Sequence, residues 1–158
     1  MKYTISEDNN NRLNFGDMDK SFFLVGLLNE FMNRFQAAGD RFFEEISWKQ
    51  CFLIICIGFF ETPPTIKDIS EMMGSSHQNI KQILLKLEKL GFLKFVPDEN
   101  DKRKQRIILT NKTDKFNKKY EKASAEFINQ LFQNIDKDDL DITIKTILQL
   151  DNQLKKMK

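Results

Sequence analysis

The strongest constraint on the fold is a succession of three patterns between residues 65 and 110. The stretch TIKDISEMM begins with a capping box, because Thr65 is followed three residues later by Asp68, and it predicts a short helix capped by Thr65. Gly74 follows and suits the left-handed conformation that often ends a helix. A second helical pattern begins at Ser75 or Ser76 and continues to Gly91. Two helices joined by so short a turn predict a helix-turn-helix.

The third pattern begins after Gly91, where the apolar period changes from that of a helix to that of a strand. Residues 92–96 (FLKFV) read as one strand, residues 97–101 (PDEND) as a turn, and residues 106–110 (RIILT) as the returning strand. These segments predict a β-hairpin whose tip, DENDKRKQ, is highly charged. A helix pair followed by a hairpin is the element order of a winged helix, so we expect a mostly α fold with a small β-hairpin.

The segments that flank this core are predicted to be helical. The first flanking helix, from Asp19 to about Gln36, is apolar around nearly its whole circumference, and such a helix must be buried on several sides. In a chain of 158 residues this indicates a partner subunit. The last helix, from Asp136, has apolar positions that approach a heptad repeat. The expected regions are a polar arm (1–18), an N-terminal dimerisation region (19–46), a winged helix-turn-helix (47–110) and C-terminal dimerisation helices (111–158).

Charge is distributed unevenly along the chain although the net charge is only +2. Residues 1–74 hold 7 basic and 11 acidic side chains, whereas residues 75–106 hold 8 basic and 4 acidic ones. The basic excess therefore lies in the second helix of the predicted pair and in the hairpin, which is typical of a nucleic-acid site. An excess of four charges is modest, and a solvated surface would also carry it.

The second helix of the pair has one apolar side and one polar side. The polar side can be an ordinary solvated face, which is common, or it can contact bases and phosphates in a DNA major groove. Asn and Gln bond to adenine edges, Lys to guanine or phosphate, and Ser to either. The preceding helix and the following basic hairpin favour the DNA interpretation. The candidate recognition residues are Ser76, His77, Gln78, Asn79, Lys81 and Gln82.

The hairpin tip also has two interpretations. A charge cluster there can be a solvated turn, or Lys102, Arg103 and Lys104 can reach the minor groove and its flanking phosphates. An acid beside these residues would weaken DNA binding unless it had a positioning role. Asp101 is close enough in sequence to orient Arg103 through an ion pair, and we assign it that role.

Other classes of function find little support in the sequence. The chain has one histidine, His77, and no Gly-rich phosphate loop or carboxylate cluster, so we expect no enzyme, no cofactor and no metal site. Cys51 and Cys56 stand in the apolar run CFLIICIGFF, where a cysteine usually packs as a small hydrophobe, and a redox-sensing role is the alternative. That run is about half the length of a membrane span, and the polar start does not resemble a signal peptide. The expected location is cytoplasmic.

At residues 65–110 the sequence resembles the winged-helix core of the MarR (multiple-antibiotic-resistance regulator) family. The family pattern L-G-x-S-x-x-x-V-x-x-x-x-x-x-L-E-x-x-G-L is met by Met73-Gly74, Ser76, Ile80, Leu87-Glu88, Gly91 and Phe92. The family wing motif, D-x-R-D-x-R before a strand that ends L-T, is similar to Asp101-Lys102-Arg103-Lys104-Gln105-Arg106 ending at Leu109-Thr110. Lys104 replaces the second Asp of the motif and adds positive charge.

The resemblance implies a homodimer, held by N- and C-terminal helices, that binds double-stranded DNA at a pseudo-palindromic operator. It also implies a transcriptional regulator, most often a repressor, that responds to a small-molecule effector or to an oxidant. No effector-binding residues are assigned. The alternative is a winged helix that binds another protein, as an antagonist of a regulator would, and never binds DNA.

Overall fold

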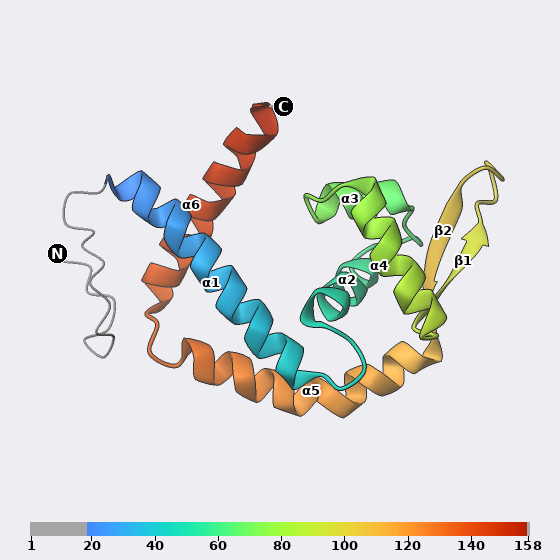
Figure 1. Ribbon diagram of the computed structural model, residues 1–158, viewed down its shortest axis with the longest axis horizontal. Helices are drawn as coiled ribbons and strands as arrows, with labels where there is room; N and C mark the ends of the chain where they lie inside the picture. Colours follow the sequence, from blue (N-terminus) through green and yellow to red (C-terminus); the bar gives the residue numbers. More distant parts are fainter. Residues whose placement is uncertain (1–18, 158) are drawn as a thin grey trace. The chain divides into compact units, whose positions relative to one another are not determined.

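The computed structural model describes residues 19–157, so the predicted polar arm (1–18) lies outside the described residues. The described part is mostly helical with one two-stranded antiparallel hairpin, and this confirms the predicted fold class (Figure 1). None of its helices is long and apolar enough to cross a membrane. The elements are α1 (Lys20–Phe42), α2 (Trp48–Gly58), α3 (Ile66–Met72), α4 (His77–Lys89), β1 (Leu93–Pro97), β2 (Gln105–Leu109), α5 (Asn111–Phe132) and α6 (Lys137–Lys156).

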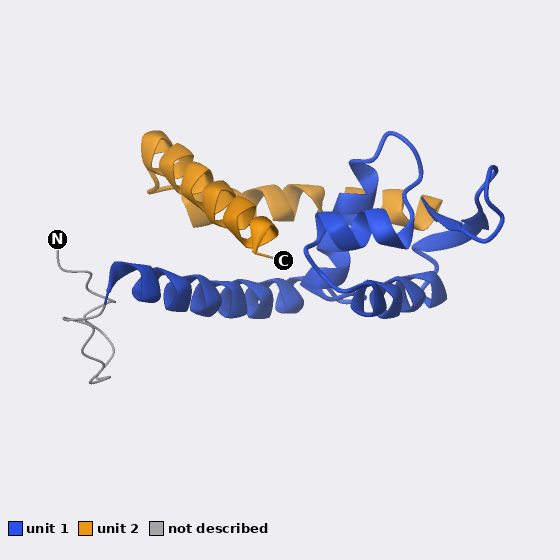
Figure 2. Ribbon diagram, turned by 90° about the horizontal axis from the view of Figure 1, so that it is seen from above, with its two compact units in different colours: residues 1–109 blue, residues 110–158 orange. Residues whose placement is uncertain are grey.

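The chain folds as two compact units, which Figure 2 shows in different colours. The first unit ends at Leu109 and contains α1 and the winged helix, and the second begins at Thr110 and contains α5 and α6. Thr110 caps α5 by accepting a hydrogen bond from the backbone N–H of Lys112 at 3.2 Å. Asp136 caps α6 in the same way, accepting from the N–H of Asp138 at 2.8 Å. Both caps satisfy N–H groups that a helix start leaves without a partner.

The junction between α1 and α2 is built around Trp48. The Trp48 ring makes an edge contact with Phe35 and stacks on Phe43, with ring centroids 4.8 and 6.1 Å apart. Gly39 lies against the same ring so closely that a Cβ atom there would come within 2.7 Å of it. The helix predicted to end at about Gln36 therefore continues to Phe42, because its last turns pack on Trp48.

Two capping boxes start α2 and α3, and the one at Thr65 was predicted from the sequence. The Ser47 hydroxyl accepts from the Gln50 N–H at 3.3 Å, and the Gln50 side chain accepts from the Ser47 N–H at 2.8 Å. In the second box the Thr65 hydroxyl accepts from the Asp68 N–H at 3.3 Å, and the Asp68 carboxylate accepts from the Thr65 N–H at 2.8 Å. Each box satisfies two backbone donors at once and specifies where the helix begins.

The turn from α3 to α4 is as short as predicted. Gly74 has a φ of 57° and the next backbone N–H, that of Ser75, donates to the carbonyl of Ser70 at 3.0 Å. This is the left-handed helix ending for which glycine is the favoured residue. The Ser76 hydroxyl then caps α4 by accepting from the N–H of Asn79 at 3.3 Å.

The hairpin is held in one register and is attached to the segment before α3. Leu93 pairs with Leu109 at its base and Pro97 with Gln105 at its far end. The Ile107 N–H donates to the carbonyl of Pro64 at 2.9 Å, and Thr65 forms an isolated bridge with Arg106. The hairpin is therefore anchored to the α2–α3 connection as well as to α4.

The core of the first unit lies where α2, α3, α4 and the hairpin meet. Its side chains are almost fully excluded from solvent, and they include Leu53, Ile69, Ile80, Leu84, Leu87, Phe92 and Ile107, each exposed by 1% or less. The spacing of Ile80, Leu84 and Leu87 explains why only one side of α4 is buried. Leu90, which the sequence places on the same side, lies just beyond the end of the helix and is 40% exposed.

Candidate nucleic-acid interface

The polar side of α4 faces solvent along its first two turns. All six candidate recognition residues are exposed, and the first of them, Ser76, is the residue that caps the helix. No acid stands in the first turn of α4. Within residues 19–157 the side chains of Gln78, Lys81 and Gln82 form no hydrogen bond or ion pair, so they remain available for an external partner.

Two serines and one asparagine form a small network at the start of α4. The Asn79 backbone N–H donates to the Ser76 hydroxyl. The Asn79 side chain donates from Nδ2 to the Ser75 hydroxyl at 2.8 Å. Ser75 itself is held in the turn by its backbone bond to Ser70. The Asn79 amide therefore has a defined direction, unlike the Gln78 amide beside it.

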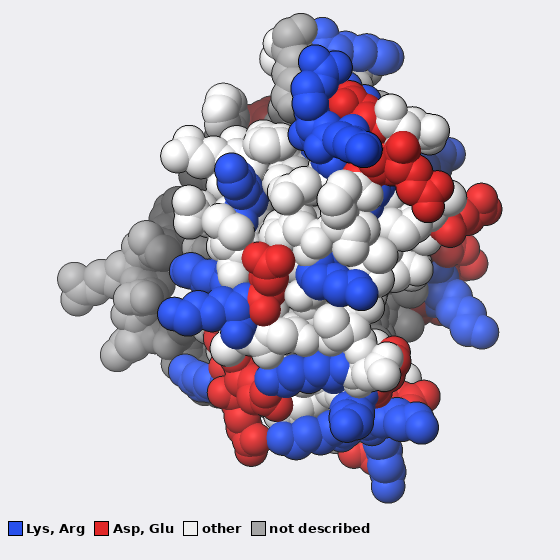
Figure 3. Space-filling view, turned by 90° about the vertical axis from the view of Figure 1, so that its right-hand side faces the viewer, with Lys and Arg blue, Asp and Glu red and all other residues white. Residues whose placement is uncertain are grey.

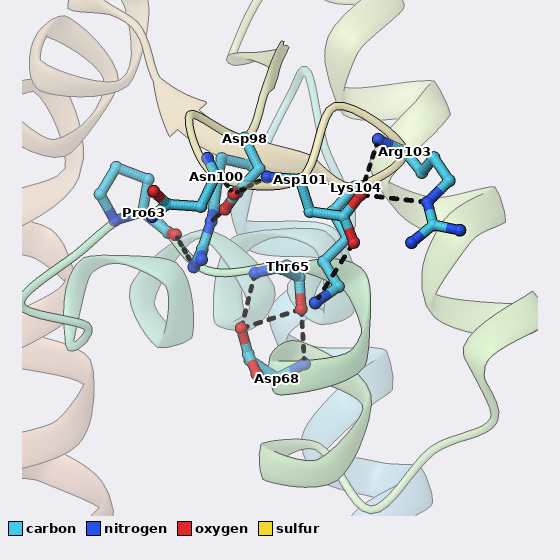
Figure 4. A network of polar contacts seen from close by, with 9 residues as sticks. Pro63, Thr65, Asp68, Asp98, Asn100, Asp101, Arg103 and Lys104 are labelled. Carbon is cyan, nitrogen blue, oxygen red and sulfur yellow. Dashed lines mark hydrogen bonds and ion pairs between the residues drawn. The ribbon is translucent and has the colours of Figure 1, made fainter.

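The residues between β1 and β2 form a tip in which one carboxylate holds two cations. The Asp101 carboxylate accepts from the Arg103 side chain at 3.2 Å and from the Arg103 backbone N–H at 3.1 Å (Figure 4). Its second oxygen lies 3.7 Å from Nζ of Lys104. The Arg103 N–H is the largest of the contributions that lower the pKa of Asp101. Asp101 thus forms an ion pair with Arg103, whose side chain remains 92% exposed.

A second carboxylate, Asp98, organises the base of this tip, although its place in the sequence did not single it out. It is 5% exposed, forms an ion pair with Arg106, and accepts from the N–H groups of Asn100 and Asp101, both at 2.9 Å (Figure 4). The bond from Arg106, and then those two N–H groups, lower the pKa of Asp98 to about 2. Arg106 also donates to the Pro63 carbonyl at 3.0 Å. Asp98 and Arg106 therefore connect the tip to the chain just before α3.

A groove of about 540 Å³ lies between the hairpin and the first residues of α3 and α4. Four basic side chains and one carboxylate lie along it, which is a composition suited to a phosphate-bearing partner. Figure 3 views the molecule from the side on which the hairpin lies in Figure 1 and shows Lys and Arg side chains on this face, with acids among them. The lining residues are Thr65, Ile66, Lys67, Asp68, His77, Arg103, Lys104, Gln105 and Arg106.

The groove brings together parts of both predicted sets. His77 comes from the recognition helix, and Arg103 and Lys104 come from the tip. Lys102 is exposed but does not line the groove. Lys67 and Gln105 were not predicted, because only the folded hairpin brings them beside the predicted cations.

The two cysteines lie in the core of the first unit, away from this surface. Both thiols are buried and unpaired in disulfides. Burial raises the pKa of Cys51 to about 11 and also raises that of Cys56. Because the thiolate is the reactive form, these environments fit the packing interpretation better than redox sensing. Within residues 19–157 no cluster of His, Cys, Asp and Glu side chains could hold a metal ion.

Comparison with known protein families shows which family the winged helix resembles. The model of the MarR family matches residues 46–104, which run from the start of α2 to the hairpin tip. The winged helix resembles that of the MarR family. The resemblance inferred from the Gly74 turn and the wing motif is thereby confirmed. A search of curated protein sequences gives no match.

Solved structures show that the MarR fold extends over most of the chain. A MarR/EmrR family transcriptional regulator from Acinetobacter sp. ADP1 is similar with a TM-score of 0.77 and 16% identity, over 91% of this chain and 99% of that one. S. aureus MepR, solved as a DNA complex, has a TM-score of 0.75 and 15% identity, over 86% and 99%. Streptococcus pneumoniae FabT in complex with DNA has a TM-score of 0.66 and 18% identity, over 87% and 99%. At these identities the likeness concerns the fold.

Proposed function

We propose that this chain is a sequence-specific DNA-binding transcriptional regulator, with α4 in the major groove and the hairpin tip at the neighbouring backbone and minor groove. The observation that carries the proposal is the groove beside the hairpin, which His77 at the start of α4 lines together with Arg103 and Lys104 of the cationic tip, next to the exposed polar side of α4. Phosphate contacts from the tip supply affinity, and the α4 side chains supply sequence preference. The DNA complexes of MepR and FabT support this reading.

The regulator acts as a homodimer on a pseudo-palindromic operator, as is usual for the family. Apolar side chains on α1 and α6 support this, because Phe22 is 76% exposed, Val25 66% and Leu154 64%. Large exposed apolar side chains on a helix favour an interaction site. Two winged helices related by a two-fold axis read half-sites about one helical turn apart.

The proposed regulation is repression that a small effector, aromatic or phenolic as is common in the family, relieves. An effector acts by binding one conformation of the dimer better than the other, so that it shifts the equilibrium between DNA-binding and non-binding forms. The location proposed with this role is the cytoplasm.

The deciding experiment is a binding titration on the DNA upstream of its own gene. We expect the dissociation constant to rise steeply with salt, because bound Lys and Arg side chains release counterions from the phosphates. The same titration repeated with a panel of aromatic acids and phenols tests the effector. Absence of binding even at low salt would reject the proposal and favour the alternative, a winged helix that binds another regulator instead of DNA.

A substitution in the tip tests the role of Arg103. Arg103→Ala removes one exposed cation and is expected to weaken operator binding on the order of tenfold while reducing the salt dependence by about one phosphate contact. Lys155→Ala is the matched control, because it removes a cation near the end of α6. Equal losses from the two variants would contradict the assignment of the tip.

A further inference from the structure

The start of α4 contains an asparagine whose amide group already has a direction before any partner binds. Asn79 is exposed, and its Nδ2 donates to the Ser75 hydroxyl at 2.8 Å. Ser75 in turn is fixed by its backbone bond of 3.0 Å to the carbonyl of Ser70, in the turn that Gly74 makes possible. The amide is therefore attached to the rigid α3–α4 turn, not only to its own helix.

A primary amide has two N–H donors and one carbonyl acceptor. Because one donor of Asn79 is bonded to Ser75, one N–H and the carbonyl oxygen remain for a base edge. In the DNA major groove adenine offers an acceptor, N7, beside a donor, the N6 amino group. Guanine offers two acceptors, cytosine one donor, and thymine one acceptor with a methyl group. Only adenine matches the remaining donor and acceptor together.

We propose that Ser75 is a positioning residue that holds Asn79 to read one adenine in each operator half-site. This inference rests on the proposed DNA-binding function and adds a residue that was absent from the predicted interface. Ser75 needs no contact with DNA, since it acts by fixing the direction of the Asn79 amide. Preorganisation of this kind sharpens recognition because the side chain loses less freedom on binding.

The neighbouring Gln78 provides the contrast within the same helix turn. Its amide is exposed and has no side-chain partner within residues 19–157, and it has one more rotatable bond than that of Asn79. An unrestrained amide adapts to several base edges at a higher entropic cost. Gln78 should therefore contribute a weaker and broader preference than Asn79, at a different base pair.

The test is selection of bound sites from a randomised DNA library, followed by sequencing, for the wild type and four variants. The wild type should enrich adenine at one position of each half-site. Asn79→Ala should reduce that enrichment on the order of tenfold, the scale of one bidentate base contact. Ser75→Ala should reduce the adenine enrichment a few-fold at the same position and leave the preference at the other positions unchanged. Ser75→Thr, which keeps the hydroxyl, should retain the adenine enrichment. Gln78→Ala is the control and should alter a different position.

The outcomes separate this inference from the proposed function. If Ser75→Ala retains the full adenine preference, or loses affinity evenly over all positions, Ser75 does not position Asn79 although the protein still binds DNA. If Ser75→Thr behaves like Ser75→Ala, the hydroxyl is not the responsible group. If the wild type selects no sequence and binds no DNA at low salt, the proposed function fails and the inference fails with it. Thermal unfolding of each variant confirms that the variants compared are folded.

Discussion

The apolar sides of α4 and α6 meet very different environments in this chain. On α4, Ile80 and Leu84 are completely excluded from solvent, whereas on α6 Ile142 is 62% exposed and Leu148 56%. Both helices are amphipathic, and the difference is whether the chain itself supplies a surface to bury them. The winged helix completes its own core, and α6 leaves large side chains for another surface to cover. Local pattern alone does not distinguish these two situations.

Truncation in the α4 core should have the largest effect. Leu84→Ala leaves a cavity beneath α4, and we expect it to lower the free energy of unfolding by about 2–5 kcal/mol. The adjacent Leu85 is 41% exposed, so Leu85→Ala should change it by less than about 0.5 kcal/mol. Urea unfolding followed by circular dichroism measures both. Similar losses in the two variants would mean that α4 is not buried on the side described.

A charge on the apolar side of α6 should have an intermediate effect, on association instead of folding. Leu148→Asp places a carboxylate where the proposed dimer buries an apolar side chain, and we expect it to weaken self-association by roughly 2 kcal/mol, about thirtyfold. Gln149→Asp introduces the same charge one residue away and is the control. Sedimentation equilibrium gives the two dissociation constants. If Leu148→Asp dimerises as well as the control, this side of α6 is not the interface.

The smallest effect concerns the Asp98–Arg106 pair, and pH reveals it. Because the folded state lowers the pKa of Asp98 to about 2 from an ordinary value of 3.8, the stabilisation is complete above pH 4 and is lost as the pH falls towards 2. Asp98→Asn should therefore be less stable than the wild type at pH 7, and the difference should shrink as the pH approaches 2. Thermal unfolding across this pH range, with Glu99→Gln as the control, measures it. A difference independent of pH would exclude Asp98 as the group that titrates.

The elements that the sequence predicted best are those specified by local chemistry. The capping box at Thr65 and the glycine turn at Gly74 depend on residues within four positions of each other, and both formed as expected. The MarR resemblance rested on the same local spacing. Whether the exposed residues of α4 and of the tip bind DNA stays a prediction.

The features that were missed depend on distant residues. Asp98 becomes important only when the hairpin register places it beside Arg106 and brings Arg106 to the Pro63 carbonyl, 43 positions away in the sequence. The extension of α1 beyond Gln36 depends on a tryptophan in the next helix. Pattern reading treats each segment separately and therefore cannot detect either contact.

The contact between Gly39 and the Trp48 ring has a consequence for how these two positions change in evolution. A Cβ atom at position 39 would lie 2.7 Å from the indole, so a larger residue at 39 requires the ring to move or to shrink. Across homologous sequences we therefore expect the two positions to vary together, with glycine at 39 wherever a large aromatic residue occupies 48. The residue at position 39 would thus limit the size of the residue at position 48, and the reverse, so that selection acts on the two positions together.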